Sequence, residues 1–102
     1  MAKKFKIDNS PFLAEDLQKA VNFYKRASGS HKLGRKIIAK TKEKILTLET
    51  NALHYEIKYS NIRCVKIKGF PYRIHFEVNE KDNTVYINGL FSTAESPNTW
   101  KR

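Results

Sequence analysis

Hydrophobic and polar residues alternate strictly over residues 69–78, which read Gly-Phe-Pro-Tyr-Arg-Ile-His-Phe-Glu-Val. One side of this segment is apolar and carries Tyr72, Ile74, Phe76 and Val78. The other side is polar and carries Arg73, His75 and Glu77. A period of two residues predicts a strand with one face on a core and one face in water. Pro71 has no amide donor, so it suits the start of that strand and not its interior.

Three further segments alternate in the same way and predict additional strands. They run from Lys3 to Asp8, from Ile62 to Lys68 and from Thr84 to Phe91. In the last of these, the pattern directs Val85, Ile87 and Phe91 to the core side and Tyr86 and Asn88 to the opposite side. Residues 80–83, Glu-Lys-Asp-Asn, form a polar hairpin turn before it.

Two segments with apolar residues three and four positions apart predict amphipathic helices. The first runs from Pro11 to about Arg26, with Ser10 as N-cap and proline at the first helical position. The second runs from His31 to about Thr50, after a break at Ser-Gly-Ser. A short turn that contains glycine makes the pair an antiparallel hairpin. Residues 51–61 show no period and are expected to connect the helices to the sheet.

The element order β-α-α-β-β-β predicts an α+β fold, in which a single domain spans residues 1–102. An N-terminal strand and a three-stranded antiparallel meander form one antiparallel sheet, with the helical hairpin on one face. The opposite face then collects mainly cationic and aromatic side chains, namely Lys66, Lys68, Arg73, His75, Tyr86 and Asn88. Such a face is typical of a platform for phosphate or nucleic acid.

The charge balance changes what the chain is expected to bind. Twenty Lys and Arg residues against ten Asp and Glu give a formal net charge of +10. A charge of this size favours polyanions or acidic protein partners. Part of it lies on the second predicted helix, where Lys36 and Lys40 belong to a basic face. That face is either a solvated surface or a binding surface, and charge alone does not separate the two.

Several classes of chemistry find no support in the sequence. The single cysteine, Cys64, excludes an internal disulfide and a Cys-rich metal site, which fits a reducing cytoplasm. The chain has no glycine-rich phosphate loop and no metal-ligand spacing, so we expect no metal and no cofactor. No signal peptide is visible, and no apolar run approaches the roughly 20 residues of a membrane span. We therefore expect a cytoplasmic protein with no membrane partner.

Several short segments resemble the RelE/ParE superfamily of toxins from type II toxin–antitoxin modules, a group that includes plasmid stabilisation proteins. The most specific is Phe-Pro-Tyr-Arg-Ile at residues 70–74, followed by Phe76. The others are Ala-Glu-Asp-Leu at residues 14–17 with Ala20 and Tyr24, Ile62-Arg63, Val-Tyr-Ile at residues 85–87, and the closing Pro-Asn-Thr-Trp-Lys-Arg. The resemblance covers nearly the whole chain and implies the same β-α-α-β-β-β order.

The resemblance also implies partners. Members of the superfamily are neutralised by a cognate antitoxin that wraps the toxin, here expected to bind through an acidic or amphipathic segment. RelE-like members cut messenger RNA on the ribosome, whereas ParE-like members poison DNA gyrase without nuclease chemistry. A basic protein of this kind inhibits bacterial growth by either route.

The two modes differ in the chemistry that they need. RNA cleavage without a metal requires a base, an acid and cations for the phosphate. Arg73 matches the strand arginine of RelE-like nucleases, and Lys66 and Lys68 resemble their basic strand residues. However, Ser92 and Glu95 stand where many relatives have His and Arg. His75 can supply one proton transfer but does not complete the set, so the sequence favours the ParE-like mode.

The candidate residues therefore fall into two groups. Arg73 and His75 are catalytic only if the chain is a nuclease. The expected target-binding residues are Lys66, Lys68, Arg63, Tyr86, Lys36 and Lys40, and in the ParE-like mode the basic helical hairpin is the target-binding surface. A third reading, a non-toxic nucleic-acid-binding module, remains open.

Structural roles compete with each of these assignments. Arg73 is alternatively a cross-strand partner for a carboxylate, and His75 a half-exposed residue of the sheet. Arg63 is alternatively an anchor for a carboxylate or a loop carbonyl. Trp100 is expected to pack back on the domain.

Overall fold

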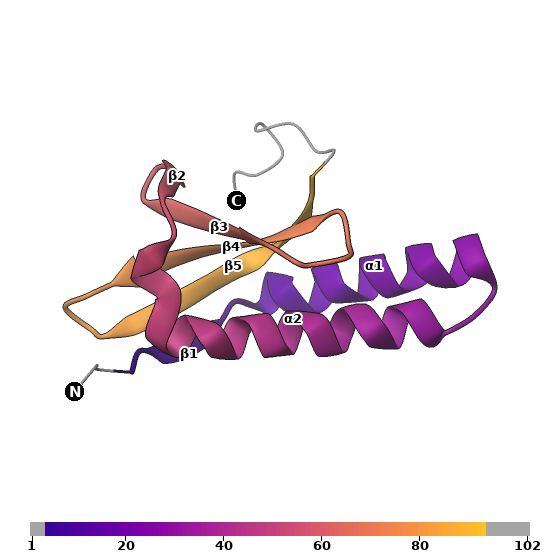
Figure 1. Cartoon of the computed structure of the whole chain (residues 1–102), viewed down its shortest axis with the longest axis horizontal. Helices are drawn as coiled ribbons and strands as arrows, with labels where there is room; N and C mark the ends of the chain where they lie inside the picture. The colour runs from indigo at the N-terminus through magenta and orange to yellow at the C-terminus, as the bar shows by residue number, and fades with distance from the viewer. Residues whose placement is uncertain (1–3, 94–102) are drawn as a thin grey trace.

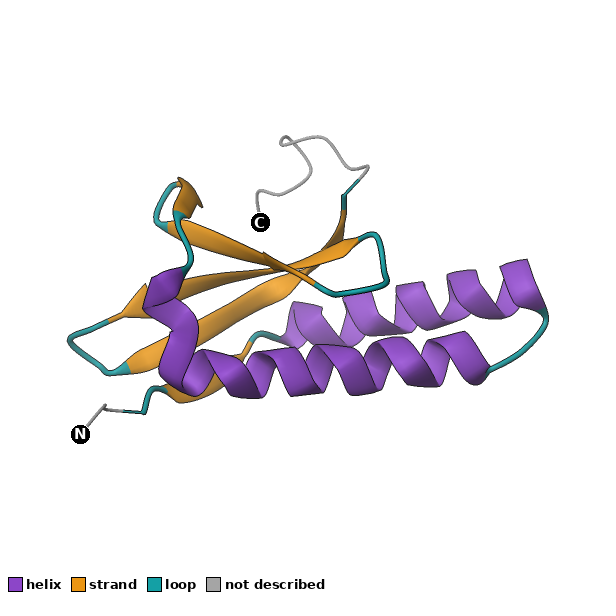
Figure 2. Cartoon of the chain, viewed as in Figure 1, coloured by secondary structure: helices purple, strands orange, loops and turns teal. Residues whose placement is uncertain are grey.

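A computed structural model describes residues 4–93 of the chain, so Glu95, Trp100 and the closing segment at residues 97–102 lie outside the described residues. The elements follow in chain order: β1 (Lys6–Asn9), α1 (Pro11–Ser28), α2 (Lys32–Asn51), the 3-10 turn η1 (Ala52–His54), β2 (Ile57–Tyr59), β3 (Ile62–Lys66), β4 (Tyr72–Asn79) and β5 (Thr84–Ser92). Two layers result, with the helical hairpin lying along one face of the sheet (Figures 1 and 2). Neither described helix has the length and apolar content that crossing a membrane requires.

The five strands form one sheet in the order β1-β5-β4-β3-β2. This arrangement confirms the α+β fold, with two corrections to the predicted sheet. First, β1 pairs with β5 in parallel, because alternation along a strand reports which face each residue occupies and not the direction of pairing. Second, a short strand, β2, lies in the segment expected to be a connection. Three residues are too few to show a period, and Ile57 at its start is 52% exposed.

The core fills the space between the sheet and the helices. Its completely buried members come from both layers and include Ile37, Leu48, Ile74, Phe76 and Ile87. The apolar sides of α2, β4 and the first half of β5 therefore face each other as the sequence pattern predicts. Burying side chains of this size is the main favourable term in folding.

The ends of the helices follow the predicted capping chemistry. Ser10 accepts a hydrogen bond from the Phe12 amide at 3.0 Å, which confirms it as the N-cap of α1. Gly29 ends α1 in the left-handed region with φ at 71°. The helices then approach closely at Gly34, where an added Cβ would lie 3.0 Å from Val21 Cγ1.

One extra residue in β5 reverses the predicted faces of its second half. Phe76 pairs with Ile87 whereas His75 pairs with Gly89, so Asn88 is inserted between them. A bulge of one residue moves everything after it to the other face. Leu90 consequently joins the core cluster, and Phe91 lies across from Arg73 on the opposite face. The prediction that Phe91 faces the core alongside Val85 is therefore wrong.

The start of α1 closes the edge of β5 where β1 ends. The parallel pairing stops at Asn9, opposite Ile87. Beyond that point, the Ser10 hydroxyl donates to the Asn88 carbonyl at 3.0 Å. The buried Asp16 carboxylate accepts the Leu90 amide at 3.0 Å. Side chains of the helix thus satisfy backbone groups that no strand pairs with here.

We predict that Asp16→Ala lowers the free energy of unfolding by about 1–3 kcal/mol, because the buried Leu90 amide loses its acceptor. Urea denaturation of both proteins measures the change. Glu15→Ala removes the neighbouring carboxylate, which is exposed, and is expected to stay within about 0.5 kcal/mol of the parent. Equal stability of the two variants would show that Asp16 does not hold this edge.

Candidate functional site

Lys66 and Arg73 form a pair of cations on the face of the sheet away from the helices, called the cation pair below. The two residues are directly opposite each other on β3 and β4, and both are exposed. Side chains in such positions lie within about 5.5 Å at Cβ, and like charges there repel. The sequence places them on one surface, and the structure agrees. An anion bound between them would relieve the repulsion.

His75 is not part of this accessible surface, although the alternation predicts that it faces water. It is 1% exposed. Its Nδ1 lies 2.8 Å from the Tyr59 hydroxyl, and its ring centroid lies 4.4 Å from that of Phe91. Two features missing from the sequence pattern account for the burial. β2, at the edge of the sheet (Figure 1), carries Tyr59, whose ring centroid lies 5.7 Å from that of His75, and the bulge turns Phe91 to the side of His75.

Cys64 lies beside this interior cluster, opposite His75 on the neighbouring strand. Burial raises the pKa of the Cys64 thiol, and the positive charges of Arg73 and Lys58 only partly oppose this effect. A neutral thiol is a poor nucleophile. Burial therefore disfavours covalent chemistry at Cys64 at neutral pH.

Two other predicted target-binding residues lie away from the cation pair. The Arg63 Nε donates to the Tyr55 carbonyl at 2.7 Å, which is the loop anchor considered as its alternative role. Tyr86 pairs with Glu77, and its hydroxyl donates to Asp82 at 3.3 Å. Burial and the Asp82 carboxylate raise the pKa of Tyr86, so its hydroxyl stays protonated. Glu77 is four residues from Arg73 along β4, about 13 Å at the usual strand rise.

Lys68 belongs to a different surface from the one predicted. β3 ends at Lys66, so the alternation no longer fixes the direction of Lys68. It lies instead with Lys36 and Lys40 of α2 around a hollow of about 400 Å³. The hollow is floored by Tyr24, Leu33 and Phe70.

A second hollow of about 120 Å³ shares Lys40 and Lys68 and adds Lys44. We call the four lysines, Lys36, Lys40, Lys44 and Lys68, the lysine cleft. Burial raises the pKa of Tyr24, so the phenol on its floor is neutral. The structure thus joins a basic part of α2 to the turn after β3, which the sequence presents as separate features.

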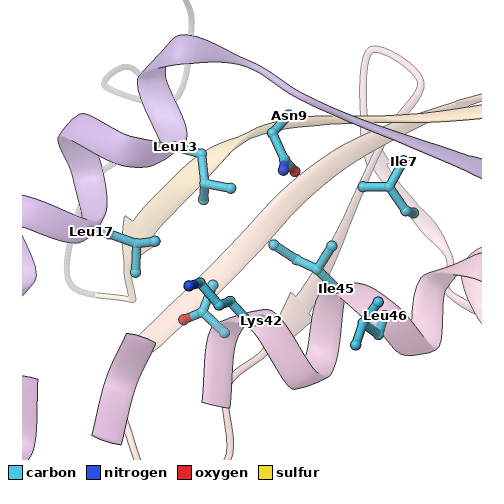
Figure 3. A pocket seen from close by; sticks show the side chains of 8 residues that line it. Ile7, Asn9, Leu13, Leu17, Lys42, Ile45 and Leu46 are labelled. Carbon is cyan, nitrogen blue, oxygen red and sulfur yellow. The ribbon is translucent and has the colours of Figure 1, made fainter. Parts of the chain in front are cut away.

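An apolar groove of about 420 Å³ lies between α1, α2 and β1 (Figure 3). Leu13 and Leu17 of α1 face Ile45 of α2 across it. Thr41 is completely buried in its wall, and its hydroxyl has no hydrogen-bond partner among residues 4–93. On the rim, Leu46 is 62% exposed. The sequence places Thr41 in the apolar stripe of the helix but gives no signal for the groove.

Within the part of the chain that the structure describes, no three His, Cys, Asp or Glu side chains gather as a metal site. The cation pair and the lysine cleft offer guanidinium and ammonium groups, and the apolar groove offers apolar side chains. Such groups bind anions and apolar side chains.

Comparisons with known proteins agree with this fold. No relative was found among curated protein sequences. A solved structure titled as the chromosomal ParDE toxin–antitoxin system from P. aeruginosa matches with a TM-score of 0.74 at 16% identity, over 87% of this chain and 96% of that chain. The toxin–antitoxin complex RelBE2 from Mycobacterium tuberculosis matches with a TM-score of 0.62 at 17% identity, over 87% and 98%. Likeness at this identity shows the fold.

The sequence itself gives the family. The family model described as "ParE toxin of type II toxin-antitoxin system, parDE" matches residues 10–97, which is most of the chain. The chain therefore belongs to the ParE toxins of type II toxin–antitoxin systems.

Proposed function

We propose that this toxin acts in the ParE-like mode, by inhibiting DNA gyrase without cutting RNA, and that a cognate antitoxin neutralises it. The match to the ParE family supports this choice over the RelE-like mode. The similar P. aeruginosa structure is also of a ParDE system. The main support, however, comes from the interior position of His75.

Cleavage of RNA needs groups that give and take protons in contact with the substrate. His75 is 1% exposed and engaged by Tyr59, so it does not meet a substrate at the cation pair. Glu77 is about 13 Å along the strand from Arg73, too far to act on a phosphate held there. In the described residues, the cation pair is therefore a place to bind an anion, and the imidazole of the neighbouring His75 is buried.

One observation favours a second candidate, a RelE-like ribosome-dependent endoribonuclease. Lys66 and Arg73 lie opposite each other and exposed on the open face. Two adjacent cations are suited to stabilise the charge of a phosphate during cleavage. In this alternative Arg73 contacts the reacting phosphate, so its removal would abolish activity.

The apolar groove is the surface that we assign to the antitoxin. An amphipathic segment would bury its apolar side against Leu13, Leu17 and Leu46. Lys42, which also lines the groove, is positioned for an acidic residue of that segment. The similar solved structures come from a toxin–antitoxin system and a toxin–antitoxin complex.

We predict that induced expression in bacteria arrests growth, with filamentous cells, DNA damage and intact messenger RNA. Arg73→Ala is expected to arrest growth equally well, because no bond is broken at the cation pair. Microscopy, a DNA-damage reporter and northern blots of abundant transcripts measure these effects, with Lys81→Ala as an exposed control. Fragmented transcripts with the parent, and a loss of cleavage on the order of 10²–10³-fold with Arg73→Ala, would instead establish the nuclease.

We predict that Leu46→Glu leaves the toxin active but weakens its binding to the antitoxin by about 10–100-fold, because a carboxylate replaces an apolar contact of the groove. Co-expression with the antitoxin should then fail to restore growth, and titration calorimetry gives the affinity. Leu53→Glu introduces the same charge at a leucine that is 44% exposed and outside the groove. If the antitoxin still neutralised the Leu46→Glu variant fully, its binding site would lie outside the apolar groove.

A further inference from the structure

Lysines recur every fourth residue along α2, at positions 32, 36, 40 and 44. Each step corresponds to about 6 Å of rise and about one turn of the helix. The ammonium groups therefore follow one side of α2 as a row of about 18 Å. Lys68 adds a further charge from the turn after β3, across the hollows that it shares with Lys36, Lys40 and Lys44.

These charges are not compensated within the described part of the chain. The structure gives none of the four cleft lysines an ion pair with a carboxylate between residues 4 and 93. Among the described residues that line the two hollows, only Glu43 is acidic. Several ammonium groups around a concave surface raise the local positive potential and attract anions. The cleft is therefore suited to a ligand that carries a series of negative charges.

We propose that the lysine cleft binds the phosphodiester backbone of nucleic acid directly and without regard to base sequence. Lysine is a flexible point charge that suits phosphate contacts without fixed geometry. Contacts to phosphates set affinity and position, whereas sequence is read at base edges. The aromatic ring of Phe70 on the floor is 5% exposed, so it offers no face on which a base can stack.

An acidic protein segment fits the cleft less well. Peptide partners gain affinity by burying apolar side chains, and Phe70 on the floor is already packed into the core, which leaves Leu33 as the exposed apolar residue of the hollow. Ile67 is 1% exposed and Phe70 is 5% exposed. The apolar groove offers that kind of surface. From α2, Lys42 and Leu46 line the groove, whereas Lys40 and Lys44 line the cleft. Two residues along a helix correspond to a turn of about 200°, so the two sites lie on different sides of α2.

This inference goes beyond the proposed function, because it requires neither gyrase nor a ribosome. It assigns to the toxin alone an affinity for nucleic acid. The cleft is also distinct from the cation pair: Lys66 and Arg73 lie on the open face of the sheet, and neither lines the two hollows.

The test measures fluorescence anisotropy of a labelled 20-base-pair DNA of arbitrary sequence, and of a 20-nucleotide RNA, against the purified full chain. The cleft variant is Lys36→Gln/Lys40→Gln/Lys68→Gln. The matched control, Lys19→Gln/Lys25→Gln/Lys81→Gln, removes the same charge from exposed positions on α1 and the β4–β5 turn. Circular dichroism and thermal unfolding establish that both variants are folded.

We expect the cleft variant to bind at least about tenfold more weakly at low salt. For three lost phosphate contacts, the slope of log affinity against log salt should fall in magnitude by about 2.7 with the duplex DNA and by about 2.1 with the single-stranded RNA. The control should retain nearly all of the affinity and the slope. Tighter binding of the DNA or of the RNA identifies the source of the phosphates, and either result supports the cleft. Equal losses in the two variants, or binding of a labelled poly-glutamate peptide in place of both nucleic acids, would overturn the proposal. Because gyrase is not in the assay, failure of the gyrase proposal leaves this result unchanged.

Discussion

The buried contact between the Asp16 carboxylate and the Leu90 amide fixes how α1 meets the sheet. β1 is only four residues long, so the far half of β5 has no strand on that side among the described residues. Backbone groups at a buried edge must find other partners, and the first turns of α1 supply them. The contact holds β5 just after its bulge, which turns Leu90 toward the core and Phe91 toward the open face. The packing of both faces depends on these two orientations.

The bulge explains why the open face exposes the cations Lys66 and Arg73 while His75 is buried. With Phe91 on this face, His75 is enclosed between it and Tyr59 and becomes part of a small interior. Lys66 and Arg73 remain accessible beside it. The four lysines of the lysine cleft lie on a different surface, where Lys68 is beside α2. The described residues thus present two cationic surfaces, and the apolar groove forms a third surface with a different chemistry.

Much of the fold follows from the sequence, because alternation and helical spacing each have a direct physical cause. The strand at residues 72–78, the helical hairpin, the Ser10 cap and the core positions Ile74, Phe76 and Ile87 are predicted correctly. The bulge at Asn88 is not, since an inserted residue leaves the pattern of residue types unchanged. Tertiary contacts also decide three further features: the parallel pairing of β1 with β5, the formation of the short strand β2, and the position of Lys68 after the end of β3. For this reason the sequence assigns Lys68 and His75 to the wrong surroundings.

Modification of histidines by diethyl pyrocarbonate, mapped by mass spectrometry, tests most directly whether His75 is enclosed. The chain has three histidines, and His31 and His54 are exposed at the helical turn and in η1. These two should react quickly in the native protein, whereas His75 should react only when the protein unfolds. Modification of His75 at the same rate as the other two would place an accessible imidazole beside Arg73 and contradict this account.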